Sequence, residues 1–117
     1  MIDLKFSKTF TVKGNIERVF DLTEKYISGM KFKIANSHKP TLLILKRGGT
    51  LGSLVSFKIE NIKTTLTLSF SQKGENVNVL CDYDVVGYGQ VFTTSDKSTL
   101  ESEVEMLKNF LQTTLPE

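Results

Sequence analysis

The chain has 117 residues, of which 39% are apolar, and its 15 Lys/Arg and 13 Asp/Glu give a formal net charge of +2. This length predicts a single domain, residues 1–117, and the ordinary composition excludes wholesale disorder. A single cysteine, Cys81, excludes an intrachain disulfide, and a single histidine, His38, leaves no partner for a histidine-based zinc site.

The first third of the chain predicts a strand followed by a helix. From Ile2 to Val12 apolar residues alternate with polar ones, which is typical of a strand with one buried face, and only Lys8 interrupts the apolar parity. Asn15 is a favourable N-cap for the helix that follows, whose apolar face begins at Ile16. Gly29 suits the left-handed position that often ends a helix.

The next segment predicts two short strands around a turn. Phe32 and Ile34 alternate with lysines in a second strand, and residues 36–40 form a polar loop with turn chemistry. The run from Thr41 to Arg47 contains four consecutive apolar residues. Such a run indicates a strand that is covered on both faces, or one that lies at an edge or a partner contact.

Three further strands are predicted in the middle of the chain. A glycine-rich connector at 48–53 leads to alternating segments at 55–59 and 65–70. A tight hairpin at Lys73-Gly74 then opens the longest strand, residues 76–85.

The stretch Ser95–Leu115 predicts one long amphipathic helix. Ser98 and Glu101 have the spacing of a capping box, although Ser95 or Asp96 also suits an earlier start. By helical angle Glu103 falls inside the apolar stripe. This stripe consists of Leu100, Val104, Leu107, Leu111 and Leu115, and is widened by Met106 and Phe110.

The order of these elements is β-α-β-β-β-β-β-α. Tight turns between consecutive strands favour an antiparallel meander, and strands that are apolar on one face favour two layers. The sequence therefore predicts an α+β two-layer sandwich, with one antiparallel sheet of about six strands and two helices on one of its faces.

The stretch Phe10–Leu22 carries the sequence Phe-Thr-Val-Lys-Gly-Asn-Ile-Glu-Arg-Val-Phe-Asp-Leu. With the element order, it resembles the opening strand, small turn and first helix of the helix-grip proteins, the Bet v 1/START-like superfamily. The resemblance implies a curved sheet wrapped around the C-terminal helix. The element order is also similar to folds related to one half of the TATA-binding protein, including small uncharacterised archaeal proteins.

Glu103 is the most discordant residue of the C-terminal helix. A buried carboxylate without a partner costs several kcal/mol or becomes protonated. It therefore reaches the helix edge, pairs with a cation or a tyrosine hydroxyl from the sheet, or faces a polar cavity. The candidate partners are Arg47, Tyr83, Tyr88 and Arg18. We interpret Glu103, Tyr83, Tyr88 and Arg47 as ligand-facing candidates, and we name no catalytic residue because no second positioned acid or base is evident.

The connector after the fourth predicted element offers a second candidate site. Arg47, Gly48, Gly49 and Gly52 combine a cation with free backbone amides, which suits an anion-binding loop. The segment lacks the Lys-Ser/Thr pair and the helix of a P-loop, so a mobile hairpin is the alternative interpretation.

Charge is divided unequally along the chain. Residues 1–63 hold twelve Lys/Arg and five Asp/Glu, whereas residues 64–117 hold three and eight. Internal pairing between the two halves, or two oppositely charged surfaces, would follow from this division.

The leading functional hypothesis is a non-enzymatic binding domain that holds a small apolar or amphipathic ligand between the sheet and the C-terminal helix. This hypothesis rests mainly on the helix-grip resemblance. The alternative is a solid-core module for protein interaction or self-association, which uses the strand at Leu42–Leu45. An enzyme of the polyketide-cyclase kind, with Glu103 as acid or base, is a third hypothesis.

The sequence indicates no cofactor or metal site. Nucleic-acid binding is disfavoured because the solvent-exposed face of the predicted sheet lacks aromatic residues on which bases could stack. The absence of a signal peptide and of an apolar run of roughly 20 residues favours a cytoplasmic protein without membrane insertion.

Overall fold

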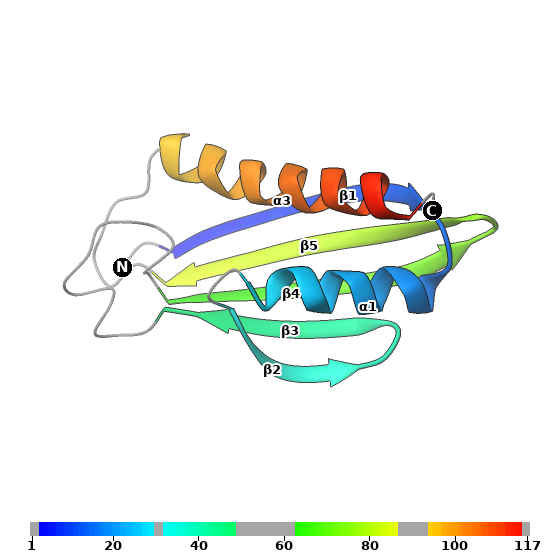
Figure 1. Ribbon diagram of the computed structural model, residues 1–117. Helices are drawn as coiled ribbons and strands as arrows, with labels where there is room; N and C mark the ends of the chain where they lie inside the picture. The colour runs from blue at the N-terminus through cyan, green and yellow to red at the C-terminus, as the bar shows by residue number, and fades with distance from the viewer. Residues whose placement is uncertain (1–2, 30–31, 49–62, 87–93, 116–117) are drawn as a thin grey trace.

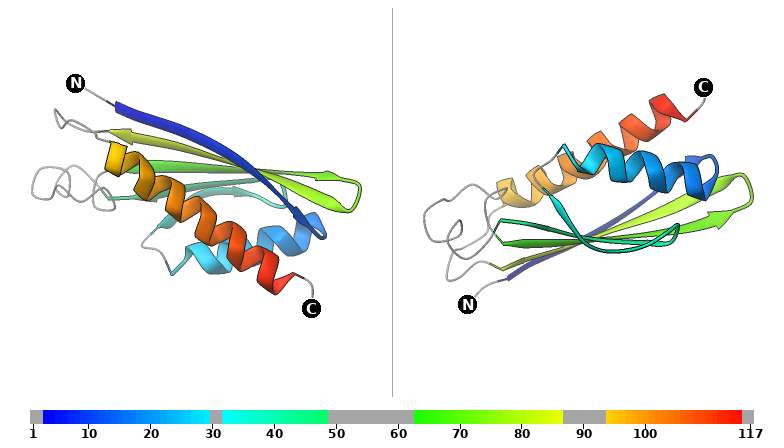
Figure 2. Two further views of the ribbon diagram at one scale, coloured as in Figure 1. Left: turned by 90° about the horizontal axis from the view of Figure 1, so that it is seen from above. Right: turned by 60° about the horizontal axis from the view of Figure 1, so that its bottom comes forward.

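The computed structural model describes residues 3–29, 32–48, 63–86 and 94–115. The elements in chain order are β1 (Asp3–Lys13), α1 (Ile16–Ile27), β2 (Lys33–His38), β3 (Leu42–Arg47), β4 (Thr64–Lys73), β5 (Asn76–Val86) and α3 (Thr94–Thr114). The strands form an antiparallel sheet in the order β1-β5-β4-β3-β2 (Figure 1). Both helices lie on the same face of this curved sheet (Figure 2). The predicted class and layering are therefore confirmed.

The described residues contain five strands rather than about six. The strand predicted at 55–59 lies outside the described residues. The remaining strands follow the predicted alternation, with eleven residue pairs between β1 and β5 in an unbroken register from Asp3↔Val86 to Lys13↔Asn76. Their inward side chains form the core, for example Phe10, Val79 and Leu68.

The second strand differs from its prediction. Residues 36–38, expected in a loop, belong to β2 and pair with β3, so the turn is confined to residues 39–41. β2 lies at the edge of the described sheet and all six of its residues are exposed, so nothing requires it to be apolar. A register shift follows Ile34, whose side chain is 46% exposed although its parity predicts burial.

The third strand is interior to the sheet, because β2 and β4 flank β3 on either side. The predicted edge position is therefore wrong. Leu43 and Leu45 are buried in the core, whereas Leu42 and Ile44 face the other way and are half-buried. The continuous apolar run thus belongs to a strand with one covered face and one partly covered face.

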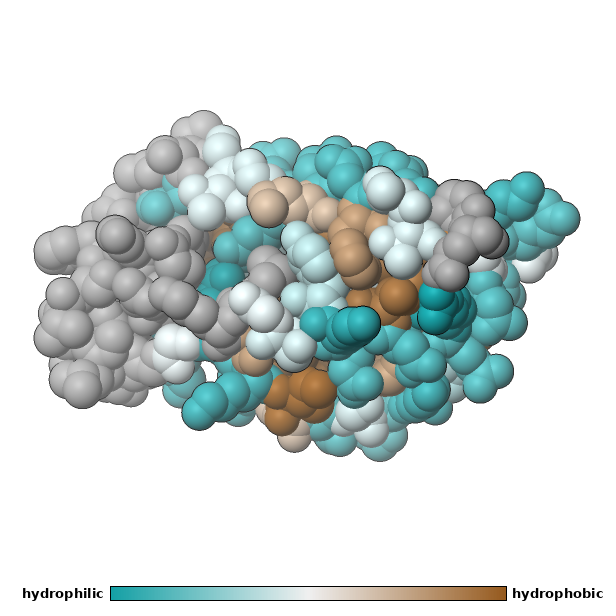
Figure 3. Space-filling view, in the orientation of Figure 1, coloured by the Kyte–Doolittle hydropathy of each residue, from teal (hydrophilic) through white to brown (hydrophobic). Residues whose placement is uncertain are grey.

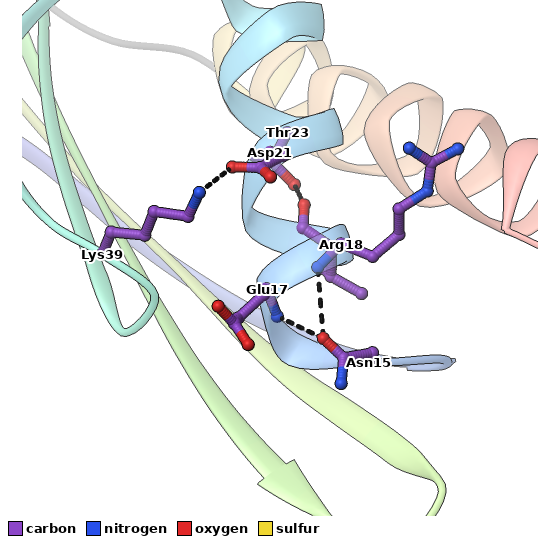
Figure 4. A network of polar contacts seen from close by, with 7 residues as sticks. Asn15, Glu17, Arg18, Asp21, Thr23 and Lys39 are labelled. Atoms are coloured by element: carbon purple, nitrogen blue, oxygen red, sulfur yellow. Dashed lines mark hydrogen bonds and ion pairs between the residues drawn. The ribbon is translucent and has the colours of Figure 1, made fainter.

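The start of α1 confirms the predicted cap. Asn15 Oδ1 accepts hydrogen bonds from the backbone N–H groups of Glu17 and Arg18 at 2.9 and 3.4 Å (Figure 4). This satisfies two donors that a helix start otherwise leaves free. The predicted left-handed end is wrong, because Gly29 is not among the glycines with a positive φ, and its N–H donates to the Tyr26 carbonyl at 3.2 Å.

A salt bridge ties α1 to the turn between β2 and β3. Lys39 Nζ lies 2.8 Å from Asp21 Oδ1, and this hydrogen bond raises the pKa of Lys39 (Figure 4). On the buried side of the helix, Thr23 Oγ1 donates to the Val19 carbonyl at 2.7 Å, so its hydroxyl is satisfied inside the core.

Among the described residues, the long helix α3 starts at Thr94, so Ser98 lies inside it and the capping box predicted there is wrong. The earlier start, which the sequence also allowed at Ser95 or Asp96, agrees with the structure to within one or two residues. Leu100, Val104, Leu107 and Leu111 are buried as predicted. Met106 is 59% exposed and does not widen the stripe. Phe110 stacks on Tyr26 of α1 with 4.7 Å between ring centres, and thus joins the two helices. In Figure 3, tan and brown surface lies between the two helices and a separate brown patch lies below α1, while most of the other coloured surface is hydrophilic.

Lys8, the polar residue on the inward parity of β1, reaches α3. Its Nζ atom lies 3.9 Å from Glu101 Oε2 and 3.7 Å from Glu105 Oε2. Lys13 of β1 similarly lies 3.9 Å from Glu75. Basic residues of the first half of the chain thus pair with acidic residues of the second half, as internal pairing predicts.

Within the described residues, no helix is both long enough and apolar enough to cross a membrane.

Candidate functional site

A polar cluster lies between the sheet and α3. It consists of Glu103 on α3, Arg47 at the end of β3, and Tyr83 on β5. Arg47 Nη1 donates to Glu103 Oε2 at 2.9 Å and Nη2 donates to Oε1 at 3.3 Å. Tyr83 Oη donates to the same Oε1 at 2.9 Å. We call these three residues the Glu103 cluster, and they confirm that Glu103 pairs with a cation and a tyrosine hydroxyl from the sheet.

The Glu103 cluster is enclosed. Arg47 is 4% exposed, Tyr83 is 2% exposed and the Glu103 side chain is 13% exposed. Charges at this depth are tolerated only when they are paired and hydrogen-bonded, and the end-on fork between Arg47 and Glu103 meets that need. Burial, followed by the nearby negative charge of Glu103, raises the pKa of Tyr83. Tyr83 therefore stays protonated and remains a donor.

Aromatic rings surround the Glu103 cluster. Arg47 Cζ lies 4.3 Å from the centre of the Phe32 ring, which is a cation–π contact. The Phe6 ring lies 6.0 Å from the Tyr83 ring in a tilted arrangement. Sequence reasoning did not include Phe32 among the site residues. No pattern in the sequence places it there, because its position follows from the β2–β3 register, in which Lys33 pairs with Lys46 and Phe32 comes opposite Arg47.

One donor of the Glu103 cluster is unused. Arg47 Nε is buried and has no hydrogen-bond partner among the described residues. A buried donor without a partner costs about 1–3 kcal/mol. The Glu103 cluster therefore contains a position at which an added acceptor is favourable.

The Glu103 cluster lies toward one end of the sheet. Arg47 pairs with Thr64, the first residue of β4, and Tyr83 pairs with Leu66. At the other end of β4, a shallow depression of about 470 Å³ is lined by Lys13, Gly14, Asn15, Gln72, Gly74 and Glu75. The Gln72 amide there donates to the carbonyls of Gly14, Gly74 and Asn76 at 2.9–3.0 Å, so its polar groups serve to hold turns together.

Three of the other residues predicted from the sequence as site residues, Tyr88, Gly49 and Gly52, lie outside the described residues. Gly48 has a left-handed backbone (φ +72°), while the Arg47 guanidinium is directed to Glu103. The anion-binding loop stays a prediction.

Cys81 is buried on the inward face of β5, and burial raises the pKa of its thiol to about 12. Because the thiolate is the reactive form, this cysteine behaves as a small apolar core residue. Among the described residues, no group of three His, Cys, Asp or Glu side chains is placed to hold a metal ion.

The three members of the Glu103 cluster are joined to one another by hydrogen bonds. Arg47 and Tyr83 together donate three hydrogen bonds to the Glu103 carboxylate. The carboxylate in turn holds the guanidinium in place through two of these bonds.

Comparison with known proteins places this geometry in a known fold. No family model and no curated protein sequence matches the chain. Among solved structures, Ara h 8.0201 matches with a TM-score of 0.69 and 8% identity over 97% of each chain. The Aha1 dimer from Colwellia psychrerythraea gives a TM-score of 0.66 and 9% identity over 96% of each chain. A START superfamily protein from Mycobacterium smegmatis gives 0.57 and 16%, over 96% of this chain and 97% of that one. The chain thus has the helix-grip, Bet v 1/START-like fold, and the predicted resemblance is confirmed at the level of fold.

Proposed function

We propose that this chain is a non-enzymatic binding domain that holds a small amphipathic molecule between the sheet and α3, beside the Glu103 cluster. The apolar body of the ligand lies against the inward side chains of the sheet and of α3. Its polar end lies at Arg47.

The observation that carries the proposal is the incomplete hydrogen bonding of the Glu103 cluster. The cluster sits in a layer otherwise built from side chains such as Phe6 and Val104, and Arg47 Nε lacks a partner among the described residues. Ligand sites are typically apolar with a few placed polar groups, which is the composition found here. The helix-grip fold supports the same location, because the resemblance implies a ligand between sheet and helix.

Binding of the neutral dye N-phenyl-1-naphthylamine tests the proposal. We expect saturable binding with increased fluorescence, and shifted ¹H–¹⁵N signals for Arg47 Nε and for the Val104 amide. Replacing Val104, which faces the sheet, by Trp should fill the layer and weaken binding. Met106→Trp is the matched control, because Met106 lies on the exposed side of the same helix.

Shifts confined to outward-facing residues such as Thr67 would contradict the proposal, and so would dye binding without saturation. Because Val104→Trp could fail to fold, the shifts in the wild-type protein serve as the independent measurement. Native mass spectrometry of protein purified under non-denaturing conditions then identifies any molecule that is carried through purification.

A self-association module remains the second candidate, supported by apolar side chains on the outer face of the sheet. Leu42 and Leu80 both pair with Ser69, so they flank it on this face, and Leu80 is exposed. If this surface joins two copies, sedimentation equilibrium will show a dimer that Leu80→Lys abolishes. A monomer from micromolar to millimolar concentration would exclude this candidate.

A further inference from the structure

We propose that the ligand presents a neutral carbonyl oxygen to Arg47 Nε, as in a ketone, ester or amide. This inference rests on the proposed function, and it adds the chemical class of the ligand's polar end. Two observations support it. The first is which N–H groups of the Arg47 guanidinium already have a partner, and the second is the balance of charge around the guanidinium.

Among the described residues, one hydrogen-bonding edge of the Arg47 guanidinium has an unpartnered donor, Nε. The edge formed by Nη1 and Nη2 is taken by Glu103, and the Phe32 ring centre lies 4.3 Å from Cζ. A guanidinium carries five N–H groups in one plane, and Nε–H lies on the edge beside the occupied one. An acceptor at Nε therefore does not compete with Glu103 for the same N–H groups.

The balance of charge selects the kind of acceptor. The positive charge of Arg47 is already balanced by the negative charge of Glu103, and the raised pKa of Tyr83 keeps its hydroxyl neutral. An anionic ligand would leave the Glu103 cluster with a net negative charge in a buried place, and would lose its own hydration. A carbonyl oxygen satisfies Nε–H and adds no charge.

A purely apolar ligand is also disfavoured, for a different reason. It would cover Nε without supplying an acceptor, so the cost of the unpaired donor would remain. Charge balance and the unpaired donor together favour a ligand that is neutral and carries an acceptor.

Three naphthalenes of similar shape separate these classes. 2-Acetylnaphthalene supplies a neutral carbonyl, 2-ethylnaphthalene supplies no acceptor, and 2-naphthoate supplies an anion. A hydrogen bond to a charged donor is worth about tenfold or more in affinity. We therefore expect the ketone to bind about tenfold more tightly than the hydrocarbon, and the carboxylate to bind more weakly than the ketone.

Arg47 Nε gives a direct signal for the same contact. Its ¹H resonance should move downfield with the ketone and stay near its original position with the hydrocarbon. Arg47→Lys keeps the charge but loses this edge, and should reduce the ratio of ketone to hydrocarbon affinity. Lys46→Met, on the exposed side of the same strand, is the matched control and should leave the ratio unchanged.

The outcomes distinguish this inference from the proposed function. Equal affinity for ketone and hydrocarbon overturns the inference and leaves the binding function standing. Tightest binding of 2-naphthoate overturns the inference in favour of an anion site. If none of the three compounds binds, both proposals fail.

Discussion

Arg47 and Phe32 form a cation–π contact in which the guanidinium carbon lies over the ring, 4.3 Å from its centre. A lysine at this position would supply a point charge and could not make the two parallel bonds to Glu103. The two bonds therefore explain why arginine suits this position.

We expect that breaking the ion pair between Arg47 and Glu103 from one side strongly lowers the stability of the fold. Glu103→Leu leaves a buried guanidinium without its counter-charge, so we expect a loss of about 3–5 kcal/mol in the free energy of unfolding. The double variant Arg47→Leu/Glu103→Leu removes both charges and should recover most of that loss. Urea unfolding of the three proteins measures the effect.

A neutral or stabilising Glu103→Leu would show that the carboxylate is merely tolerated. Glu105→Leu is the matched control, because Glu105 lies on the same helix in a more exposed pair with Lys8. We expect its effect to be within about 1 kcal/mol.

The hydroxyl of Tyr83 should contribute separately from its ring. Tyr83→Phe keeps the contact with Phe6 but removes the hydrogen bond to Glu103. A bond to a charged group is worth about 1.5–3 kcal/mol, and we expect a loss of this size by chemical denaturation. Tyr26→Phe is the control, because the Tyr26 ring stacks on Phe110 and its hydroxyl has no hydrogen-bond partner among the described residues. Equal effects of the two substitutions would argue against the role given to the Tyr83 hydroxyl.

The parts of the fold that could be predicted are those that the core constrains. Alternation identifies β1, β4 and β5 because one face of each strand is covered and must be apolar. It fails for β2, an exposed edge strand in which polar residues carry no penalty. Met106 shows the same limit on α3: its angle predicts burial, but a helix buries only the arc that its neighbours reach.

The candidate site was predictable in part for a related reason. A carboxylate inside an apolar stripe is costly without a partner, so the sequence predicts candidate partners for Glu103, and the structure shows Arg47 and Tyr83 among them. Phe32 could not be selected in this way, because its place opposite Arg47 depends on the strand register. The loop predicted at 36–40 ends β2 too early to set that register.

The buried thiol of Cys81 predicts a loss of stability in alkali. Its pKa is raised from 9.0 to about 12, so the stability gained from the neutral thiol is complete below pH 9 and is lost progressively as pH rises toward 12. Between pH 9 and pH 10, the Cys81 thiol alone should lower the free energy of unfolding by up to about 1.4 kcal/mol for each pH unit. Cys81→Ala should remove that part of the slope, and urea unfolding at several pH values measures it. An unchanged slope would mean that the thiol is as exposed in the folded protein as in the unfolded chain.

The pairs made by Lys8 should respond to salt, unlike the pair made by Arg47. Lys8 is partly exposed and lies 3.7 Å from Glu105, so a double-mutant cycle with Lys8→Met and Glu105→Gln should give a coupling of about 0.2–1 kcal/mol. In 1 M NaCl the screening length is about 3 Å, and this coupling should vanish. The coupling between Arg47 and Glu103 should persist, because both side chains are shielded from ions. Similar salt sensitivity of the two pairs would contradict the burial of Arg47.

The distance along the chain between Arg47 and Glu103 has a consequence for folding kinetics. The two residues are 56 positions apart, and the pair joins β3 to the last helix. Contacts that close such long loops form after local ones, because the entropy of loop closure must be overcome first. We therefore expect the pair to be largely absent from the folding transition state, so that its energy slows unfolding rather than accelerating folding. The Glu103 cluster thus sets how long the folded molecule persists more than how quickly it is reached.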